Sequence, residues 1–311
     1  MAVYLSLHET ESDYKKLTLN SKNTPHAAYI IDTNQCYYTP EILPIGVGDV
    51  AYWDTSANVV KTTPKTKWSS DLGTPVGVVV IPEGMLPDGK ARMISLKYAT
   101  SAGTSSDSYV NMPWGGYGTD TNLTNYTKVP TTDNAGSTSN GSNSYGYLPS
   151  DKFSGTESYV DPKSKYNGST PMIPSPYLGD DKILNPEYSK TISGNNVLSD
   201  FNGLSNTEVL VGLGADYIAA NAAHNYNGGV TGTNIQWYLP AAGELGFLVP
   251  RFNAINASIT TVGGSSVASD YFWSSSEYSS NYAYYISTYN GRVRSNDKGS
   301  STYVRPFAVL P

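Results

Sequence analysis

The sequence predicts an α+β protein with two parts: a small N-terminal β module, and a larger domain of two helices packed on antiparallel sheets. The first observation is composition. Charged residues are 15% of the 311 residues, whereas about 25% is usual, and there are 29 glycines and 19 prolines. Such a chain is typical of many turns and long ordered loops. The second observation is a series of short apolar runs that indicate strands, and the third is two segments with helical spacing.

Residues 1–70 are predicted to form a β module that anchors the protein and oligomerises it. Two pairs of apolar runs, each pair separated by a turn-forming segment, predict hairpins at 27–38 and 49–61. About 70 residues are marginal for independent folding. We therefore expect this module to be stabilised by docking or self-association, with a trimer favoured.

Residues 71–311 are predicted to form the larger domain. It opens with apolar runs at 76–81 and 91–96, which predict a buried hairpin. Residues 100–195 are dense in Ser, Thr, Asn, Gly, Pro and Tyr. Disorder is the usual interpretation of such a segment, but its many aromatic residues favour an ordered, loop-rich insertion.

A first helix is predicted over 207–224. Ser205 and Glu208 have the spacing of a capping box, and apolar residues follow on one face. Gly212 and Gly214 weaken this helix, because glycine costs about 1 kcal/mol in a helix interior.

A second helix is predicted after Pro240, which suits a first helical position, with Glu244 in the first turn. Helical spacing continues to Ile259, and Pro250 is expected to kink or split the element. The remaining apolar runs, from Tyr271 onward, predict strands.

Composition and charge exclude several classes of function. A net charge of -6 without a Lys/Arg cluster opposes nucleic-acid binding. The single Cys36 excludes an internal disulfide and a C-x-x-C site. The three histidines are widely separated. We therefore expect no metal, no cofactor and no enzymatic activity.

The N-terminal residues lack the basic and apolar regions of a secretory signal. No run approaches the roughly 18 apolar residues that span a membrane. We therefore expect no membrane insertion, and a virion component made in the host cytoplasm and released by lysis fits this pattern.

Residues 278–303 have the composition of a binding surface. This segment is rich in Tyr, Ser, Asn and Gly and lies between apolar blocks at 272–273 and 304–310. Tyrosine offers large, stiff contact area, whereas Ser, Asn and Gly offer adaptable hydrogen bonding. The alternative is a tyrosine-rich hairpin without a partner, whose charged residues only protect a sheet edge from aggregation.

Within this segment, tyrosine faces would stack on sugar rings, and arginines would donate to hydroxyls or carboxylates. Asn290-Gly291 predicts a type I′ turn that places Tyr289 beside Arg292. The predicted ligand-binding residues are Tyr278, Asn281, Tyr282, Tyr284, Tyr289, Asn290, Arg292, Arg294, Asn296 and Ser301.

Three segments carry a resemblance to a known family: 237–245 (WYLPAAGEL), 272–278 (FWSSSEY) and 303–310 (YVRPFAVL). With the two helices before a Trp- and Tyr-rich sheet, they resemble the variable-protein branch of the C-type-lectin-like fold. This branch includes targets of diversity-generating retroelements and receptor-binding tropism determinants of tailed phages. The layout also resembles virion proteins of phages that infect gut bacteria.

The resemblance implies structural roles for the motif residues Trp237, Pro240, Glu244, Trp273 and Arg305. Glu244 is expected to cap its helix, and Arg305 to pair with an acid such as Glu277 or Glu244, because an unpaired buried charge is costly.

The chemistry of related lectins and enzymes is not expected. The calcium-binding motifs of sugar-binding C-type lectins are absent, and residues 271–311 hold only two acids. Formylglycine-generating enzymes share the fold but need a cysteine pair, which this chain lacks.

The leading hypothesis is a phage virion surface protein, in the head or in a tail fibre. Its N-terminal module would bind other virion proteins, and its lectin-like face would bind a glycan or protein on the host surface. One alternative is a purely structural decoration or fibre protein whose lectin-like domain packs on neighbouring subunits. Another is a glycan hydrolase using Glu244 and Glu277 as a carboxylate pair.

Overall fold

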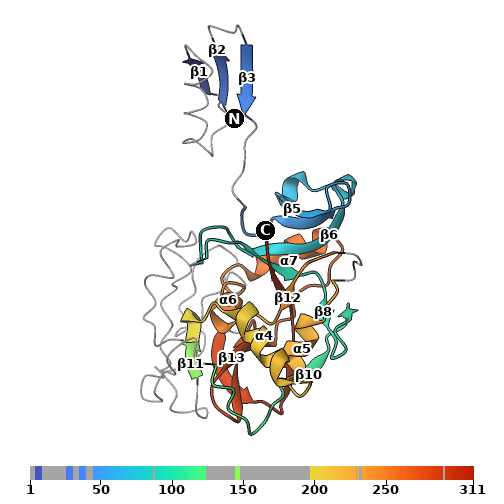
Figure 1. Cartoon of the computed structure of the whole chain (residues 1–311), viewed down its shortest axis with the longest axis vertical. Helices are drawn as coiled ribbons and strands as arrows, with labels where there is room; N and C mark the ends of the chain where they lie inside the picture. Colours follow the sequence, from blue (N-terminus) through green and yellow to red (C-terminus); the bar gives the residue numbers. More distant parts are fainter. Residues whose placement is uncertain are drawn as a thin grey trace. The chain divides into compact units, whose positions relative to one another are not determined.

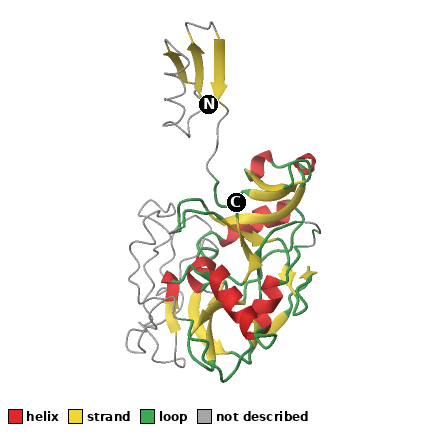
Figure 2. Cartoon of the chain, in the orientation of Figure 1, coloured by secondary structure: helices red, strands yellow, loops and turns green. Residues whose placement is uncertain are grey.

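The computed structural model describes residues 4–8, 26–30, 35–39, 45–86, 88–123, 144–147, 197–228, 230, 233–289 and 291–311. The chain divides into two compact units, residues 1–46 and 47–311 (Figure 1). The predicted α+β class is confirmed: the sheets are mostly antiparallel and the helices are few (Figure 2).

The first unit contains a three-stranded sheet in the order β1-β2-β3. Its strands are β1 (Tyr4–His8), β2 (His26–Ile30) and β3 (Gln35–Thr39). The antiparallel pairing of β2 with β3 confirms the predicted hairpin at 27–38. Strand β1, which the sequence pattern did not predict, pairs with β2 in parallel.

The second unit begins earlier than the sequence predicts. The hairpin of β4 (Val50–Asp54) and β5 (Val59–Thr63) is confirmed. However, β4 also pairs with β6 (Thr74–Ile81). The predicted boundary at residue 70 is therefore wrong, because β4 and β5 extend the sheet of the larger unit.

That sheet has six strands in the order β12-β17-β7-β6-β4-β5. Its other strands are β7 (Arg92–Ser95), β12 (Trp237–Tyr238) and β17 (Phe307–Val309). The pairing of β6 with β7 confirms the predicted hairpin. Strand β17 lies between β7 and β12, so the end of the described chain joins two distant segments.

A second six-stranded sheet, in the order β10-β16-β13-β14-β15-β11, carries the predicted binding residues. All its pairings are antiparallel except that of β13 with β16. Its strands are β10 (Asn111–Pro113), β11 (Ser144–Tyr147), β13 (Tyr271–Glu277), β14 (Tyr282–Ser287), β15 (Arg292–Asp297) and β16 (Ser301–Tyr303). A small pair, β8 (Tyr98–Ala99) and β9 (Ser105–Ser106), lies apart from both large sheets in the pairing.

The first predicted helix is wrong in its extent. It forms two helices, α4 (Gly203–Leu213) and α5 (Ile218–His224), and its N-cap is Asn202. Gly214 has a φ of 128°, a conformation that ends α4 because residues with a Cβ rarely adopt it.

The second predicted helix is split, as Pro250 indicated. It forms α6 (Ala242–Gly246) and α7 (Phe252–Thr261). Pro240 lies before the N-cap Ala241 and not at the first helical position. The described 3₁₀ helices are η1 (Lys65–Lys67), η2 (Ser70–Leu72) and η5 (Val197–Ser199).

One hydrophobic core joins the two large sheets through α6 and α7. Val78 and Ile94 enter it from the first sheet, Phe272 and Ile286 from the second. Leu245 of α6 also lies in this core. Because side chains from both sheets and from the helices pack in one core, the second sheet is held in place against the rest of the unit.

The predicted loop-rich insertion at 100–195 is described only at 100–123 and 144–147, and its other residues lie outside the described part of the chain. Among the described residues, no helix is both long and apolar enough to cross a membrane.

Candidate functional site

The predicted binding residues lie on three strands and two connecting segments of the second sheet. Tyr282 and Tyr284 belong to β14, and Ser301 starts β16. Arg292, Arg294 and Asn296 belong to β15. Tyr278 and Asn281 lie in the turn before β14, and Tyr289 lies in the loop after it. Asn290 lies outside the described residues, as does the side chain of Arg292.

These residues do not share one face of the sheet. Arg294 pairs with Tyr285 and Asn296 with Ala283, so their side chains lie on the opposite face from Tyr284. Tyr284 is only 2% exposed and belongs to the hydrophobic core. The prediction that Tyr284 contacts a ligand is therefore wrong. Tyr282 lies on the same face of β14, but it starts the strand and is 38% exposed, whereas Tyr284 lies two residues further into the strand and is packed in the core.

The predicted residues also lie at two ends of the sheet. Tyr282 starts β14, and Tyr289 follows its other end. The strand between these ends is about 17 Å long at the usual rise per residue. The loop from β14 to β15 is residues 288–291, so the predicted two-residue turn is wrong. Tyr289 therefore cannot join Tyr282 in a small binding site.

The end at Tyr282 forms a composite surface, here called the 117–282 surface, from residues 115–121, 278–282 and 297–300. The backbone N–H of Gly118 donates to the carbonyl oxygen of Ser280 at 3.0 Å. Tyr117 is 60% exposed and Tyr282 is 38% exposed. Two exposed tyrosine rings thus lie on segments that are far apart in the chain, and a backbone hydrogen bond joins these two segments.

Glycines allow the segment 115–121 to pack closely below Tyr117. Gly115 has a φ of 96° and Gly116 a φ of 63°. A Cβ on Gly115 would lie 1.9 Å from the carbonyl oxygen of Asp216, and one on Gly116 would lie 2.3 Å from the Tyr217 ring. Only glycine fits both positions, which places Tyr117 at the surface.

A buried ion pair lies below this surface. The Lys298 ammonium donates to Glu277 Oε1 at 2.5 Å and to the carbonyl oxygen of Thr119 at 2.7 Å. Glu277 also accepts from the Thr121 hydroxyl at 2.7 Å. Lys298 lies 4.8 Å from the centre of the Trp114 ring. Both charged side chains are fully buried.

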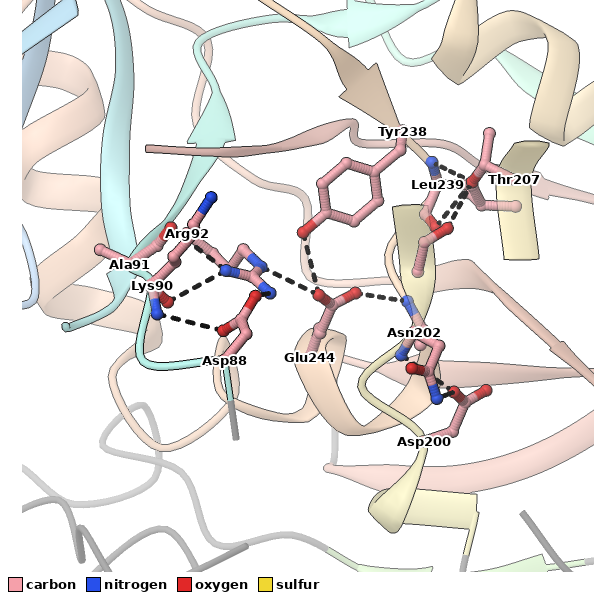
Figure 3. Close-up of polar contacts among 12 residues, drawn as sticks. Asp88, Lys90, Ala91, Arg92, Asp200, Asn202, Thr207, Tyr238, Leu239 and Glu244 are labelled. Carbon is pink, nitrogen blue, oxygen red and sulfur yellow. Dashed lines mark hydrogen bonds and ion pairs between the residues drawn. The ribbon is translucent and has the colours of Figure 1, made fainter. Parts of the chain in front are cut away.

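A second buried carboxylate, Glu244, joins α6 to the first sheet (Figure 3). Its Oε1 accepts from Arg92 Nε at 3.1 Å and from the Tyr238 hydroxyl at 2.9 Å. Its Oε2 accepts from the backbone N–H of Ala241 at 3.0 Å, which confirms the predicted helix cap. Burial raises the pKa of Glu244 to about 7, against the lowering effect of Arg92.

A third buried carboxylate, Asp200, ties α4 to β13. Asp200 accepts from the Ser276 hydroxyl at 2.6 Å and from Asn206 Nδ2 at 3.0 Å. It also accepts from Asn202, which lies beside it in Figure 3. Burial raises the pKa of Asp200, and these hydrogen bonds oppose the rise. The serines of β13 are thus buried, and Ser276 makes an internal hydrogen bond.

The other motif residues are also internal. Trp237 and Trp273 are buried, and Trp273 Nε1 donates to the carbonyl oxygen of Met112 at 3.0 Å. The Pro240 carbonyl oxygen accepts from the backbone N–H of Ser275 at 2.8 Å.

The predicted acidic partner of Arg305 is wrong. Arg305 donates to the carbonyl oxygens of Ser95 and Ser265 and lies 4.5 Å from the centre of the Tyr98 ring. The acids predicted for it, Glu277 and Glu244, bind other cations. Carbonyl oxygens and a ring face replace the carboxylate in holding this buried guanidinium.

Glu244 and Glu277 do not form an open carboxylate pair. Each is fully buried, and each binds a different cation, Arg92 or Lys298. These two residues are therefore not the accessible pair of carboxylates that was considered for a glycan hydrolase. In the described part of the chain, no group of three or more His, Cys, Asp or Glu side chains has the arrangement of a metal site.

Sequence reasoning missed Tyr117, Lys298, Arg92 and Asp200. The run Trp114 to Gly118, a tyrosine flanked by glycines, was a detectable signal for a tightly packed loop that presents an aromatic ring. For each of the three buried charges, one contact joins segments far apart in the chain: Arg92 with Glu244, Asp200 with Ser276 and Lys298 with Thr119. Sequence patterns do not show such contacts.

No family model matches the sequence, and a search of curated proteins found no match. Among solved structures, the chain is similar to a fimbrial protein from Bacteroides ovatus ATCC 8483, with 14% sequence identity and a TM-score of 0.45. The match covers 92% of this chain and 52% of the fimbrial protein, so the chain spans about half the length of that protein.

Proposed function

We propose that this protein is a virion surface protein, in a head or tail fibre, that binds a glycan on the host surface through the 117–282 surface. The observation that carries the proposal is the pair of exposed rings, Tyr117 and Tyr282, on backbones joined between Gly118 and Ser280. Exposed aromatic faces with polar neighbours are suited to stacking on sugar rings, and the rigid tyrosine side chain loses little entropy on binding.

The charges of this surface favour a neutral glycan. Within 115–121, 278–282 and 297–300, the acids are Asp120 and Asp297, and the only cation, Lys298, is fully buried. An anionic sugar would therefore meet carboxylates without an exposed cation to balance it. Hydroxyl-bearing residues such as Ser279 and Ser280 can exchange hydrogen bonds with sugar hydroxyls.

The finer fold assignment is part of the proposal. Helices α4 to α7, which take the place of the two predicted helices, precede the Trp- and Tyr-rich strands β13 to β16, and Arg305 leads into the returning strand β17. This order is the one expected from the resemblance to C-type-lectin-like variable proteins. The resemblance, and not the geometry, supports the placement on a virion.

The N-terminal unit is proposed as the anchoring and trimerising element, which binds other virion proteins. In the described part of this unit, β1 and β3 are the outer strands of a sheet with five residues in each strand. Short, few-stranded sheets have little independent stability. Association with other chains would supply what the unit lacks.

The test is binding to an array of neutral hexose oligosaccharides and their sialylated forms. We expect Tyr117→Ala and Tyr282→Ala each to weaken binding to a neutral glycan about tenfold, since an aromatic contact is worth about 1–2 kcal/mol. The matched control is Tyr289→Ala: this ring is 58% exposed but lies beyond the other end of β14. Binding should remain as in the wild type.

Equal loss in all three variants, or no loss in any folded variant, would contradict a ligand site at this surface. The structural alternative makes a different prediction. If the domain only packs on neighbouring subunits, Tyr117 and Tyr282 should be covered by another chain in a structure of the assembled particle.

A further inference from the structure

We infer that Lys298 is the positioning residue of the 117–282 surface: its buried ammonium holds the segment 115–121 in place, without a metal ion. The inference deepens the proposed function and rests on it where ligand binding is concerned. Lys298 directly follows β15 and is 0% exposed.

Lys298 contacts all the segments of the surface. Its backbone N–H donates to the carbonyl oxygen of Asn281 at 2.9 Å, and its carbonyl oxygen accepts from the N–H of Gly115 at 3.1 Å. Its ammonium donates to the carbonyl oxygen of Thr119. One residue therefore connects the turn before β14 with both ends of the loop that carries Tyr117.

The ion pair holds the loop at a second point. Glu277 Oε2 accepts from the backbone N–H of Thr121 at 3.1 Å and from its hydroxyl at 2.7 Å, while Oε1 binds Lys298. Thr119 and Thr121 are thus both bound to one charged pair. Because this pair is fully buried, solvent screens these contacts little.

The chemistry of the ammonium fits its surroundings. A lysine side chain has three N–H donors and no acceptor. Two donors reach Glu277 and Thr119, and the Trp114 ring, 4.8 Å away, provides a cation–π contact. Oxygens and an aromatic face thus surround a cation that belongs to the chain, so the loop needs no bound ion for its order.

A single substitution would leave Glu277 buried without its cation and would destabilise the whole domain. The informative variant is the double substitution Lys298→Met with Glu277→Leu, which removes both charges and keeps similar volumes. Replacement of a buried ion pair by apolar side chains is often neutral for stability. We expect cooperative unfolding with a Tm within about 5 °C of the wild type.

The double variant should nevertheless lose the order of the loop. Met and Leu cannot bind the Thr119 carbonyl oxygen or the Thr121 N–H. We expect the amides of 115–121 to exchange with solvent at least about tenfold faster than in the wild type. Affinity for the neutral glycan of the array should fall about tenfold or more.

The matched control is another buried ion pair among the described residues, replaced in the same way by Arg92→Met with Glu244→Leu. This pair is also buried, and its contacts lie at α6 and the first sheet. We expect exchange in 115–121 and glycan affinity to stay at wild-type values. A chelator added to the wild type should likewise change neither measurement.

Wild-type exchange rates in 115–121 of the Lys298 double variant would overturn the positioning role, as would faster exchange after chelation. Equal acceleration in the control variant would also overturn it, because the effect would then be a general loss of stability. Faster exchange with unchanged glycan affinity would instead contradict the proposed binding surface.

Discussion

Replacing Trp273 with alanine is expected to lower the free energy of unfolding by about 3–5 kcal/mol, the usual cost of removing a large aromatic side chain from a core. Trp273 is fully buried, its Nε1 donates to the Met112 carbonyl oxygen, and its ring meets Tyr285 edge to face. The substitution leaves a cavity and removes the hydrogen bond from the indole to the Met112 carbonyl oxygen. Urea unfolding of the purified variant measures the loss.

The matched control for this substitution is Tyr271→Ala. Tyr271 lies two residues earlier on the same face of β13 and also contacts Tyr285, but it is 41% exposed. We expect this substitution to cost about 1 kcal/mol or less. An equal loss in the free energy of unfolding for the two variants would contradict the assignment of Trp273 to the tightly packed core that supports the 117–282 surface.

The second large effect is a loss of stability as Glu244 ionises. Burial raises the pKa of Glu244 from its ordinary value of 4.5 to about 7 in the folded protein. Between these values the folded state holds the proton more tightly than the unfolded state does. Stability from this group therefore falls as the pH rises from 4.5 to 7, by about 3 kcal/mol at about 1.4 kcal/mol per pKa unit.

The Glu244→Gln variant isolates this effect, because glutamine does not titrate. Near pH 5, where Glu244 is protonated in the folded state, we expect the wild type to be the more stable. Its hydroxyl oxygen can still accept from the Ala241 N–H or from Arg92 Nε, whereas the glutamine amide nitrogen only donates. Between pH 4.5 and pH 8 the difference should shift by about 3 kcal/mol in favour of the variant. Chemical unfolding at several pH values measures it.

Asp88 provides the control for this pH dependence. Asp88 binds the same Arg92 at 2.7 Å but is largely exposed, and its pKa is lowered from 3.8. Burial opposes the lowering, and the hydrogen bond from Arg92 contributes to it. Its stabilising effect is lost only as the pH falls below about 4. Asp88→Asn should therefore keep the wild-type slope between pH 4.5 and 8, and a flattened slope would contradict the assignment to Glu244.

Local patterns predicted most of the described strands. The hairpins at 27–38, 49–61 and 76–96 follow from alternating or continuous apolar runs separated by turn residues. The same patterns were misleading where a break depends on backbone conformation. Gly214, with its φ of 128°, divided a segment that helical spacing alone predicted as one helix.

The candidate site was predictable only in part. Composition indicated a tyrosine-rich surface near Tyr282, but it could not separate Tyr282 from Tyr284 or place Tyr289 at the other end of β14. Tyr282 and Tyr284 lie on the same face of β14, so the alternation of side chains along the strand does not separate them. Tyr282 is exposed at the start of the strand and Tyr284 is packed in the core, and these tertiary contacts are not contained in the composition.

The sequence by itself determined the α+β class, most strand positions, the helix cap at Glu244 and the buried role of Trp237 and Trp273. Each depends on neighbouring residues or on side-chain size. Only the tertiary structure decided which cation pairs with which acid and which tyrosine side chains are exposed to solvent. Glu277 binds Thr121 across 156 positions and Glu244 binds Arg92 across 152, and contacts at such separations depend on how all the intervening segments fold.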